Sequence, residues 1–326
     1  MELRIRIEST SLPENDPRPV RGYTGGTLSE PTIRPIPMAF EMLRTLSAGR
    51  VSERLPIVLW QERSDSEDFT QAYQHLDFMS IYIAQRGSGV HLVEEVPFAV
   101  QAGDVYAMSM GMSHRFEASG DLSLDAIHFV PTMFGSEILN GLSEVEGLVP
   151  LFLGHPGGEV ERWLRLDPAA HAQVQEMVRD LHREWERDAA DRALMVQAIF
   201  LRLLVFLGRR HHSERPLESN LVSGVREAIE SRYAEPLRIH DLAASVFLSP
   251  GRFTELFREA VGCSPREYLS GVRIRAAQDL LRTTDLAVST IAVRIGIPDR
   301  AYFARFFRQE TGMSPTEYRE ASLISR

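Results

Sequence analysis

Two stretches near the carboxyl end of the chain repeat each other and decide how that part folds. Residues 242–268 read LAASVFLSPGRFTELFREAVGCSPREY, and residues 291–318 read IAVRIGIPDRAYFARFFRQETGMSPTEY. Their apolar and glycine positions recur in order at a period of 49 or 50 residues, from Leu242 and Ile291 to Gly262 and Gly312. Each stretch predicts a short helix, a turn, and a second helix with apolar residues at i, i+3 and i+4, the anatomy of a helix-turn-helix unit.

Local signals mark where the second helix of each unit begins. Ser249 precedes Pro250, which pairs a side-chain N-cap with a proline at the first helical position, where its missing N–H has no cost. In the other unit Pro298 precedes Asp299, and we expect the Asp299 carboxylate to cap that helix.

A further helix follows each unit. Ser264-Pro265-Arg266-Glu267 and Ser314-Pro315-Thr316-Glu317 both read as capping boxes, directly after a glycine that ends the preceding helix. The first box predicts a helix over 265–281 that joins the two units and spans about 25 Å.

These paired motifs, with the Phe-rich core of each second helix and the Gly-x-Ser-Pro-x-x-Tyr close, resemble the DNA-binding domain of the AraC/XylS family of transcription regulators. Pro298 departs from the family pattern, which commonly has a capping Ser there. The resemblance implies that the second helices read two successive major grooves, about 34 Å apart. By matching the family's motif, the base readers are expected to be Gly251, Thr254, Glu255, Arg300, Ala301 and Arg305, with Arg252, Arg258 and Arg308 on the same exposed faces.

Charge divides the chain into two parts. Residues 215–326 hold 16 Arg against 14 acidic residues, whereas the first 214 hold 20 against 31, within a total net charge of −9. An acidic module therefore precedes a mildly basic one. The apolar run over 195–207 is too short and too interrupted to span a bilayer, and the amino terminus shows no export signal, so we expect a cytoplasmic protein. Cys263, the single cysteine, excludes an internal disulfide.

The first part of the chain predicts a β-domain followed by helices. Between Phe78 and Pro131 short β-branched and aromatic runs alternate with Gly-containing turns, which predicts antiparallel strands of a sandwich or barrel. Apolar stripes between Pro168 and His212 predict an αα-hairpin, which could form a dimer interface or cover the core of its own domain. Six prolines within 13–37 favour an extended arm.

Residues 74–131 are similar to the cupin-like sensor domain of the same family, which implies a small effector, such as a sugar or related metabolite, bound inside a β-barrel. The candidate effector-binding residues are polar or aromatic groups on predicted strands: His75, Asp77, Tyr82, His91, Tyr106, His114 and His128. The resemblance further implies a homodimer and contact with RNA polymerase.

We therefore expect an α+β two-domain protein. Its organisation is an arm and lead-in (1–59), a cupin-like antiparallel β-barrel with a helical hairpin (60–212), a linker (213–220), and an all-α domain with two helix-turn-helix motifs (221–320). The main hypothesis is an effector-responsive activator with no catalytic residue, cofactor or metal. Two alternatives stay open: a regulator whose first domain binds no effector, and a metal-dependent cupin enzyme, for which the ligand set is incomplete.

Overall fold

The computed structural model describes residues 34–47, 51, 54–66, 69–118, 121–153, 163–211 and 217–324. The chain divides into two compact units, the first made of residues 1–217 with 244–248 and the second of 218–243 with 249–326. The extended arm expected within 13–37 lies outside the described residues up to position 33. Of the linker expected over 213–220, residues 213–216 also lie outside them, and residues 217–220 are helical. No helix among the described residues has both the length and the apolarity needed to cross a membrane.

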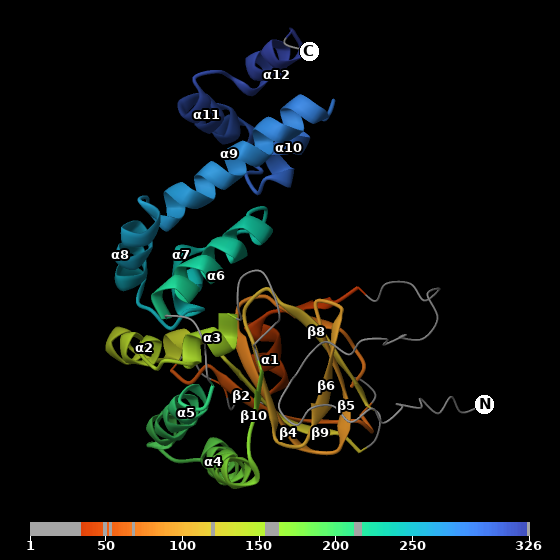
Figure 1. The fold of residues 1–326 in the computed structure, drawn as a ribbon, viewed down its shortest axis with the longest axis vertical. Coiled ribbons are helices and arrows are strands. Elements are labelled where there is room, and N and C mark those ends of the chain that lie inside the picture. Colours follow the sequence, from red (N-terminus) through yellow and green to blue (C-terminus); the bar gives the residue numbers. More distant parts are fainter. Residues whose placement is uncertain are drawn as a thin grey trace, which may run out of the picture. The chain divides into compact units, whose positions relative to one another are not determined.

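The first unit contains two five-stranded sheets (Figure 1). The strands of one sheet follow the order β1 (Ile36–Met38), β3 (Tyr73–His75), β8 (Ser113–Ala118), β5 (Ser88–Val93) and β6 (Val96–Gln101). The strands of the other follow the order β10 (Trp163–Arg165), β7 (Asp104–Met108), β4 (Met79–Arg86), β9 (Ser123–Phe129) and β2 (Ile57–Arg63). All neighbours pair antiparallel except β1 and β3, which confirms the predicted antiparallel β-domain.

One apolar core draws its side chains from strands of both sheets. Tyr82 and Ala126 come from one sheet, Phe98 and Phe116 from the other, and all four are buried in the same cluster. Strand β4 is buried over six consecutive residues from Met79, as expected for a central strand covered on both faces. The two sheets therefore enclose the interior in which the effector candidates were expected to meet.

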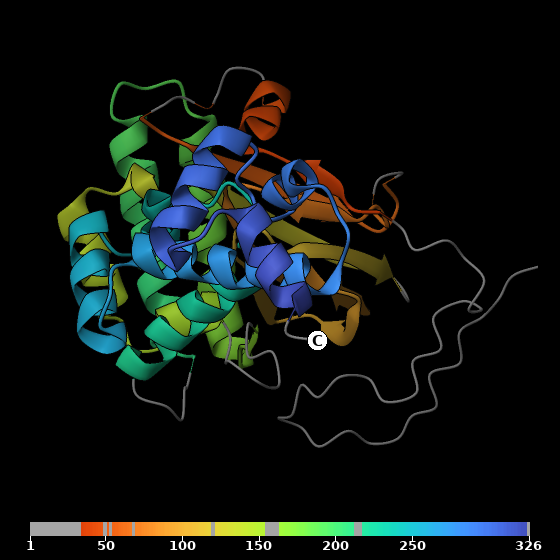
Figure 2. The same ribbon diagram turned by 90° about the horizontal axis from the view of Figure 1, so that it is seen from above.

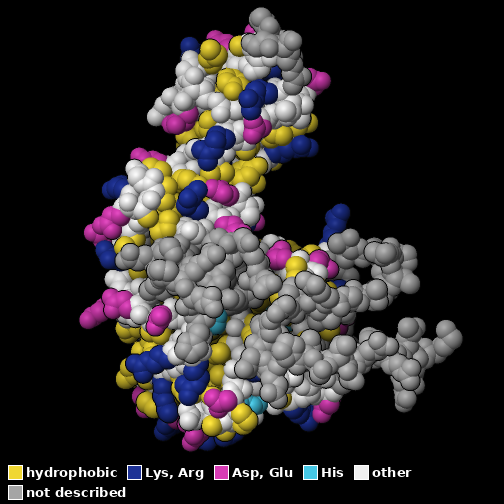
Figure 3. Space-filling model, viewed as in Figure 1, with side chains coloured by type: hydrophobic (Ala, Val, Ile, Leu, Met, Phe, Trp, Pro, Cys, Tyr) yellow, Lys and Arg dark blue, Asp and Glu magenta, His cyan; other side chains and the backbone are white. Residues whose placement is uncertain are grey.

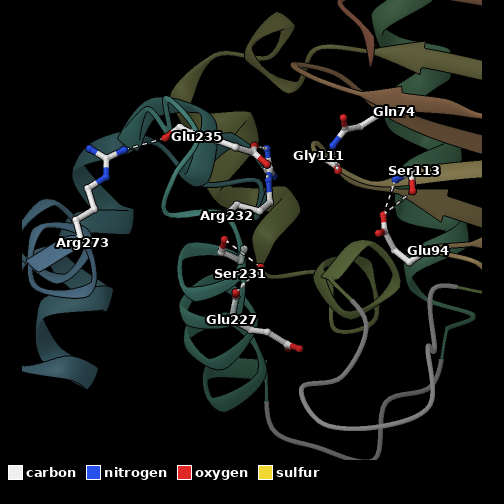
Figure 4. Close-up of polar contacts among 10 residues, drawn as sticks. Gln74, Glu94, Gly111, Ser113, Glu227, Ser231, Arg232, Glu235 and Arg273 are labelled. Atoms are coloured by element: carbon white, nitrogen blue, oxygen red, sulfur yellow. Dashed lines mark hydrogen bonds and ion pairs between the residues drawn. The ribbon is translucent and has the colours of Figure 1, made fainter. Parts of the chain in front are cut away.

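The tight turn between β5 and β6 shows how strand register is fixed locally. Glu94 and Glu95 occupy positive φ values of 48° and 65°, which non-glycine residues rarely adopt. The Glu94 carboxylate accepts hydrogen bonds from the main-chain N–H of Ser113 at 2.6 Å and from its hydroxyl at 3.2 Å (Figure 4). These bonds tie the turn to the start of β8 and stabilise its left-handed backbone.

Helices flank the sheets of the first unit. They are α1 (Phe40–Leu46), the 3-10 turn at Pro131–Met133, α2 (Ser136–Ser143), α3 (Leu148–Leu153), α4 (Pro168–Glu186) and α5 (Arg192–Gly208). The predicted αα-hairpin is α4 packed on α5 (Figures 1 and 2). Its inner face covers the domain's own core, because the Trp185 indole donates to the Ile57 carbonyl at 3.1 Å and the Phe200 ring lies 4.7 Å from that of Phe129.

The second unit is helical. Its helices are α6 (Leu217–Arg232), α7 (Ile239–Ala244), α8 (Pro250–Val261), α9 (Pro265–Thr283), α10 (Val288–Arg294), α11 (Arg300–Thr311) and α12 (Pro315–Ile324). The predicted joining helix is α9, and it extends two residues beyond the expected end at Leu281. Arg273 of α9 donates to the carbonyls of Tyr233 and Glu235, each at 2.8 Å, which fixes α9 against the end of α6 (Figure 4).

Candidate nucleic-acid interface and effector site

The second helices of the two motifs, α8 and α11, start and stop by the same local devices. Ser249 caps α8 through its side chain, and the Asp299 carboxylate caps α11 by accepting from the N–H groups of Ala301 and Tyr302 at 2.9 and 3.0 Å. Gly262 and Gly312 end the two helices with φ of 84° and 80°. The prediction that Asp299 replaces the family's Ser as the cap is confirmed.

Burial along the two helices repeats residue by residue. Positions 251–260 and 301–310 share one pattern, in which the third and seventh positions are buried and the first, second, fifth and last three are exposed. The buried residues are the phenylalanines 253, 257, 303 and 307, all with zero exposure. Each helix thus anchors one face in its own core and leaves the opposite face open.

The predicted DNA-binding residues lie on these open faces. On α8, Gly251, Arg252, Glu255 and Arg258 are exposed and Thr254 is half-buried. The Thr254 hydroxyl donates to the Pro250 carbonyl at 2.7 Å, and the Arg252 guanidinium pairs with the Glu255 carboxylate at 2.8 Å. The Glu255 carboxylate therefore has a cationic neighbour on the same helix face.

The open face of α11 is more cationic. Arg300, Ala301, Arg305 and Arg308 are all exposed, and no acidic side chain occurs among residues 300–309. The structure also exposes Tyr302 by 46%, with its ring stacked on that of Phe306 at 5.9 Å. Sequence reasoning missed Tyr302, although its place next to Ala301 on the same face was readable from the helical period.

Basic and acidic side chains are interspersed over the visible surface of the helical unit, where no continuous basic region forms (Figure 3). This distribution agrees with the nearly balanced charge of residues 215–326.

The effector candidates converge between the two sheets of the first unit. His75, His91 and His114 come from β3, β5 and β8 of one sheet, and Tyr82, Tyr106 and His128 come from β4, β7 and β9 of the other. None of the six is more than 5% exposed. Asp77, the seventh candidate, does not join them, because it is exposed and its carboxylate accepts from the Phe40 N–H at 2.7 Å.

A continuous chain of polar contacts links five of these residues, whereas the Tyr106 hydroxyl donates to the Ala99 carbonyl at 2.8 Å. His91 Nε2 lies 3.1 Å from His114 Nδ1, and His114 Nε2 lies 3.0 Å from the Tyr82 hydroxyl and 3.1 Å from His75 Nε2. The Ser80 hydroxyl continues the chain, at 3.4 Å from His75 Nδ1 and 2.7 Å from His128 Nδ1. Sequence reasoning missed Ser80, whose position two residues before Tyr82 on a strand places both side chains on one face.

Burial keeps these imidazoles neutral. Loss of hydration lowers the pKa of His114 to about 3 and that of His128 to about 3, and it lowers the pKa values of His75 and His91 well below the ordinary range. For the same reason the pKa values of the Tyr82 and Tyr106 phenols are raised. The interior is thus an uncharged polar cluster enclosed by apolar side chains.

The cavity beside this cluster is small, whereas a more open cavity of about 510 Å³ lies elsewhere in the first unit, with Trp60, Gln61 and His182 in its wall. A cavity of about 10 Å³ lies beside His91 and Tyr106, and its wall is completed by Val93, Phe98, Ala107, Met108 and Trp163. Among the described residues, no group of three or more His, Cys, Asp or Glu side chains is arranged to hold a metal ion.

Comparison with known proteins matches the chain to two domain families. Residues 57–204 match the AraC-like ligand binding domain family, and residues 242–321 match a helix-turn-helix domain family. The HTH-type transcriptional activator RhaR of Yersinia pseudotuberculosis serotype O:1b is 27% identical over 279 residues, which cover 84% of this chain and 92% of that protein. RhaR of Escherichia coli O139:H28 is 26% identical over 74% of this chain and 85% of its own length.

Among solved structures, the DNA-binding domain of AdpA in complex with a target DNA is 30% identical to this chain. The match covers 32% of this chain and 95% of that one, with a TM-score of 0.32.

The two matched domains define a class, the transcription regulators that join a ligand-binding domain to a DNA-binding helix-turn-helix domain. Within that class, the chain belongs to the AraC family. The resemblance drawn from the repeated motifs and the α+β two-domain fold are both confirmed, as is the function of a regulator that combines a DNA-binding helix-turn-helix domain with a ligand-binding domain.

Proposed function

We propose that this chain reads DNA with the open faces of α8 and α11 and that a small effector held between the two sheets of the first unit controls the outcome. The observation that carries the proposal is the residue-by-residue repeat of burial along the two helices. Both helices leave the same positions exposed, and on α11 two of these positions are the arginines 305 and 308. Two such helices on one module suit two successive major grooves.

The exposed arginines of α11 are the main candidates for base contact. Arginine binds guanine through two parallel hydrogen bonds, whereas arginines that contact phosphate contribute affinity without sequence preference. We propose Arg300 and Arg305 as base readers and Arg308, one turn after Arg305, as a phosphate contact. On α8 we propose Gly251, Thr254 and Glu255 as base readers, with Arg252 and Arg258 beside the backbone.

The test compares Arg305→Ala with Arg308→Ala in the full chain, on DNA selected by the wild-type protein. Arg305→Ala should weaken binding and relax preference at one base pair by about 1–3 kcal/mol, whereas Arg308→Ala should weaken binding to all sequences alike. Arg183→Ala is the matched control, since Arg183 is an exposed α4 arginine paired with Asp180 at 2.9 Å. An unchanged base preference in Arg305→Ala removes Arg305 as a reader.

We propose further that the regulator acts as a homodimer on cytoplasmic DNA, contacts RNA polymerase and catalyses no reaction. An apolar surface on α5 supports dimer formation, because Leu194 is 70% exposed and Met195 39% exposed while the inner face of the hairpin is buried. Light scattering of Leu194→Glu against the wild type tests this point. A dimer that persists unchanged in the variant excludes this surface.

The small cavity beside His91 also favours a second hypothesis, in which the first unit binds no effector and only dimerises. A cavity of about 10 Å³ is far below the roughly 300–1,000 Å³ of ordinary ligand pockets. A thermal-shift screen against small metabolites and metal ions separates the two readings, because only an effector-binding domain gains stability.

A further inference from the structure

The polar cluster between the sheets contains a triangle of donor atoms. Its corners are His75 Nε2, His114 Nε2 and the Tyr82 hydroxyl oxygen. The two nitrogens lie 3.1 Å apart, and the hydroxyl lies 3.0 Å from His114 Nε2 and 3.4 Å from His75 Nε2. In a tetrahedral site with metal–ligand bonds of about 2.0–2.1 Å, neighbouring ligand atoms are separated by about 3.3 Å. The triangle therefore has the dimensions of three ligands around one transition-metal ion.

The orientation of the two imidazoles also fits a metal. Their ring centroids are 4.9 Å apart, and the ring planes are inclined at 84°. Two Nε2 atoms that pointed straight at each other across 3.1 Å would hold the centroids farther apart, since each centroid lies roughly 1 Å behind its nitrogen. The two rings are therefore inclined to each other and are not aligned head-on along the line between the two Nε2 atoms.

The other nitrogen of each imidazole is engaged by a neighbour. His114 Nδ1 contacts His91 Nε2 at 3.1 Å, and His75 Nδ1 faces the Ser80 hydroxyl at 3.4 Å. A histidine that binds metal through Nε2 has its Nδ1–H directed at such a partner, which fixes its tautomer and orientation. His91 and Ser80 are therefore positioning residues for this arrangement.

We propose that His75, His114 and Tyr82 bind a first-row divalent transition-metal ion, such as Zn²⁺, and that this ion is the effector of the proposed regulator. The inference rests on the proposed effector control. The described residues contain no metal-binding group made of His, Cys, Asp and Glu alone. The proposed site differs from such a group because its third donor is the phenol oxygen of Tyr82. The closed interior favours an ion over a sugar, since a sugar would have to displace several buried side chains.

Binding of one metal ion releases one proton from the protein. The ion replaces the phenol proton of Tyr82, which leaves to solvent, and the two imidazoles bind as neutral ligands through Nε2. One phenolate against a divalent ion leaves one positive charge, and a fourth position stays available to water or to an anion. Nitrogen and oxygen donors together suit Zn²⁺, Cu²⁺ and Ni²⁺ better than Mg²⁺ or Ca²⁺.

The experiment uses the full chain, stripped with EDTA and then titrated with ZnCl₂, with bound metal measured after desalting. We expect one equivalent per chain in the wild type and none in His75→Gln or His114→Gln. His91→Gln should bind roughly 10–100-fold more weakly, as for other losses of an orienting partner. His240→Gln, which removes an exposed imidazole of α7, is the control and should keep the full equivalent.

Tyr82→Phe provides a test that does not depend on whether the histidine variants fold. With Cu²⁺ as the probe, the wild type should show a visible phenolate-to-metal charge-transfer band, and the conservative variant should lack it. A folded wild-type chain that retains no metal, or a band unchanged by Tyr82→Phe, overturns the site.

DNA affinity and reporter transcription are then measured with and without Zn²⁺. A change of at least about tenfold that is absent in Tyr82→Phe supports the ion as effector, and stoichiometric binding without any change overturns that role. DNA binding in EDTA is scored separately. A chain that binds DNA but no metal refutes this inference alone, whereas a chain that binds no DNA under any condition refutes the proposed function.

Discussion

Gly296 approaches the main chain of Ala234 so closely that a Cβ at position 296 would lie 2.5 Å from the Ala234 carbonyl oxygen. The glycine sits in the turn of the second helix-turn-helix motif with φ of 77°. Ala234 cannot easily withdraw, because Arg273 holds the carbonyls of Tyr233 and Glu235 on either side of it. The turn and the end of α6 are therefore fitted to a residue without a side chain.

Gly296→Ala should destabilise the second unit by about 2–4 kcal/mol, from left-handed backbone strain together with the steric clash. Gly312→Ala is the matched control, because the φ of Gly312 is 80° and no atom lies within 4 Å of the position that a Cβ would occupy there. It should lose only the strain, about 1–2 kcal/mol. Urea unfolding followed by circular dichroism measures both, and equal losses would show that the close approach to Ala234 has no energetic weight.

The second prediction concerns Asp299, which caps α11. Asp299→Ala removes the acceptor of the Ala301 and Tyr302 N–H groups and should cost about 0.5–2 kcal/mol. Asp299→Ser should recover most of this loss, since a serine hydroxyl can also cap. If Asp299→Ala unfolds at the same urea concentration as the wild type, the cap contributes nothing to stability.

The buried histidines predict a pH dependence of the first unit in EDTA. His114 and His128, with pKa values of about 3, stay neutral in the folded state, while in the unfolded chain they take up protons below their ordinary pKa of about 6.5. The unfolded state thus binds more protons between these values. Stability should be fully present above pH 6.5 and fall as the pH drops towards 3, by about 1.4 kcal/mol per pH unit for each histidine.

The three tryptophans, Trp60, Trp163 and Trp185, all lie in the first unit, so their fluorescence follows its unfolding alone. His128→Gln should flatten the dependence by about one proton, with His240→Gln as the control. The groups that face His128 are Ser80, His75, His114 and Tyr82. A slope that His128→Gln leaves intact would contradict the assignment of a neutral His128 in the folded state.

The sequence alone determined the helical unit in detail. The helix caps are local, because each hydrogen bond joins residues at most three positions apart, as at Ser249, Asp299 and the box formed by Ser264 and Glu267. The apolar period of α8 and α11 follows from helix geometry. The open faces that carry Arg252 and Arg305 could be predicted for the same reason, because local hydrogen bonds and the 3.6-residue period do not depend on distant parts of the chain.

Only the tertiary structure decided which polar residues of the first unit meet. His75, His91 and His114 reach one point because β3, β8 and β5 pair in a given register, and Tyr82 joins them across the interior from the other sheet. Asp77, two residues from His75, is exposed and bonds to the Phe40 N–H instead. Strand pairing joins residues far apart in the chain, and a shift of one residue reverses every side chain, so no local pattern could specify this cluster.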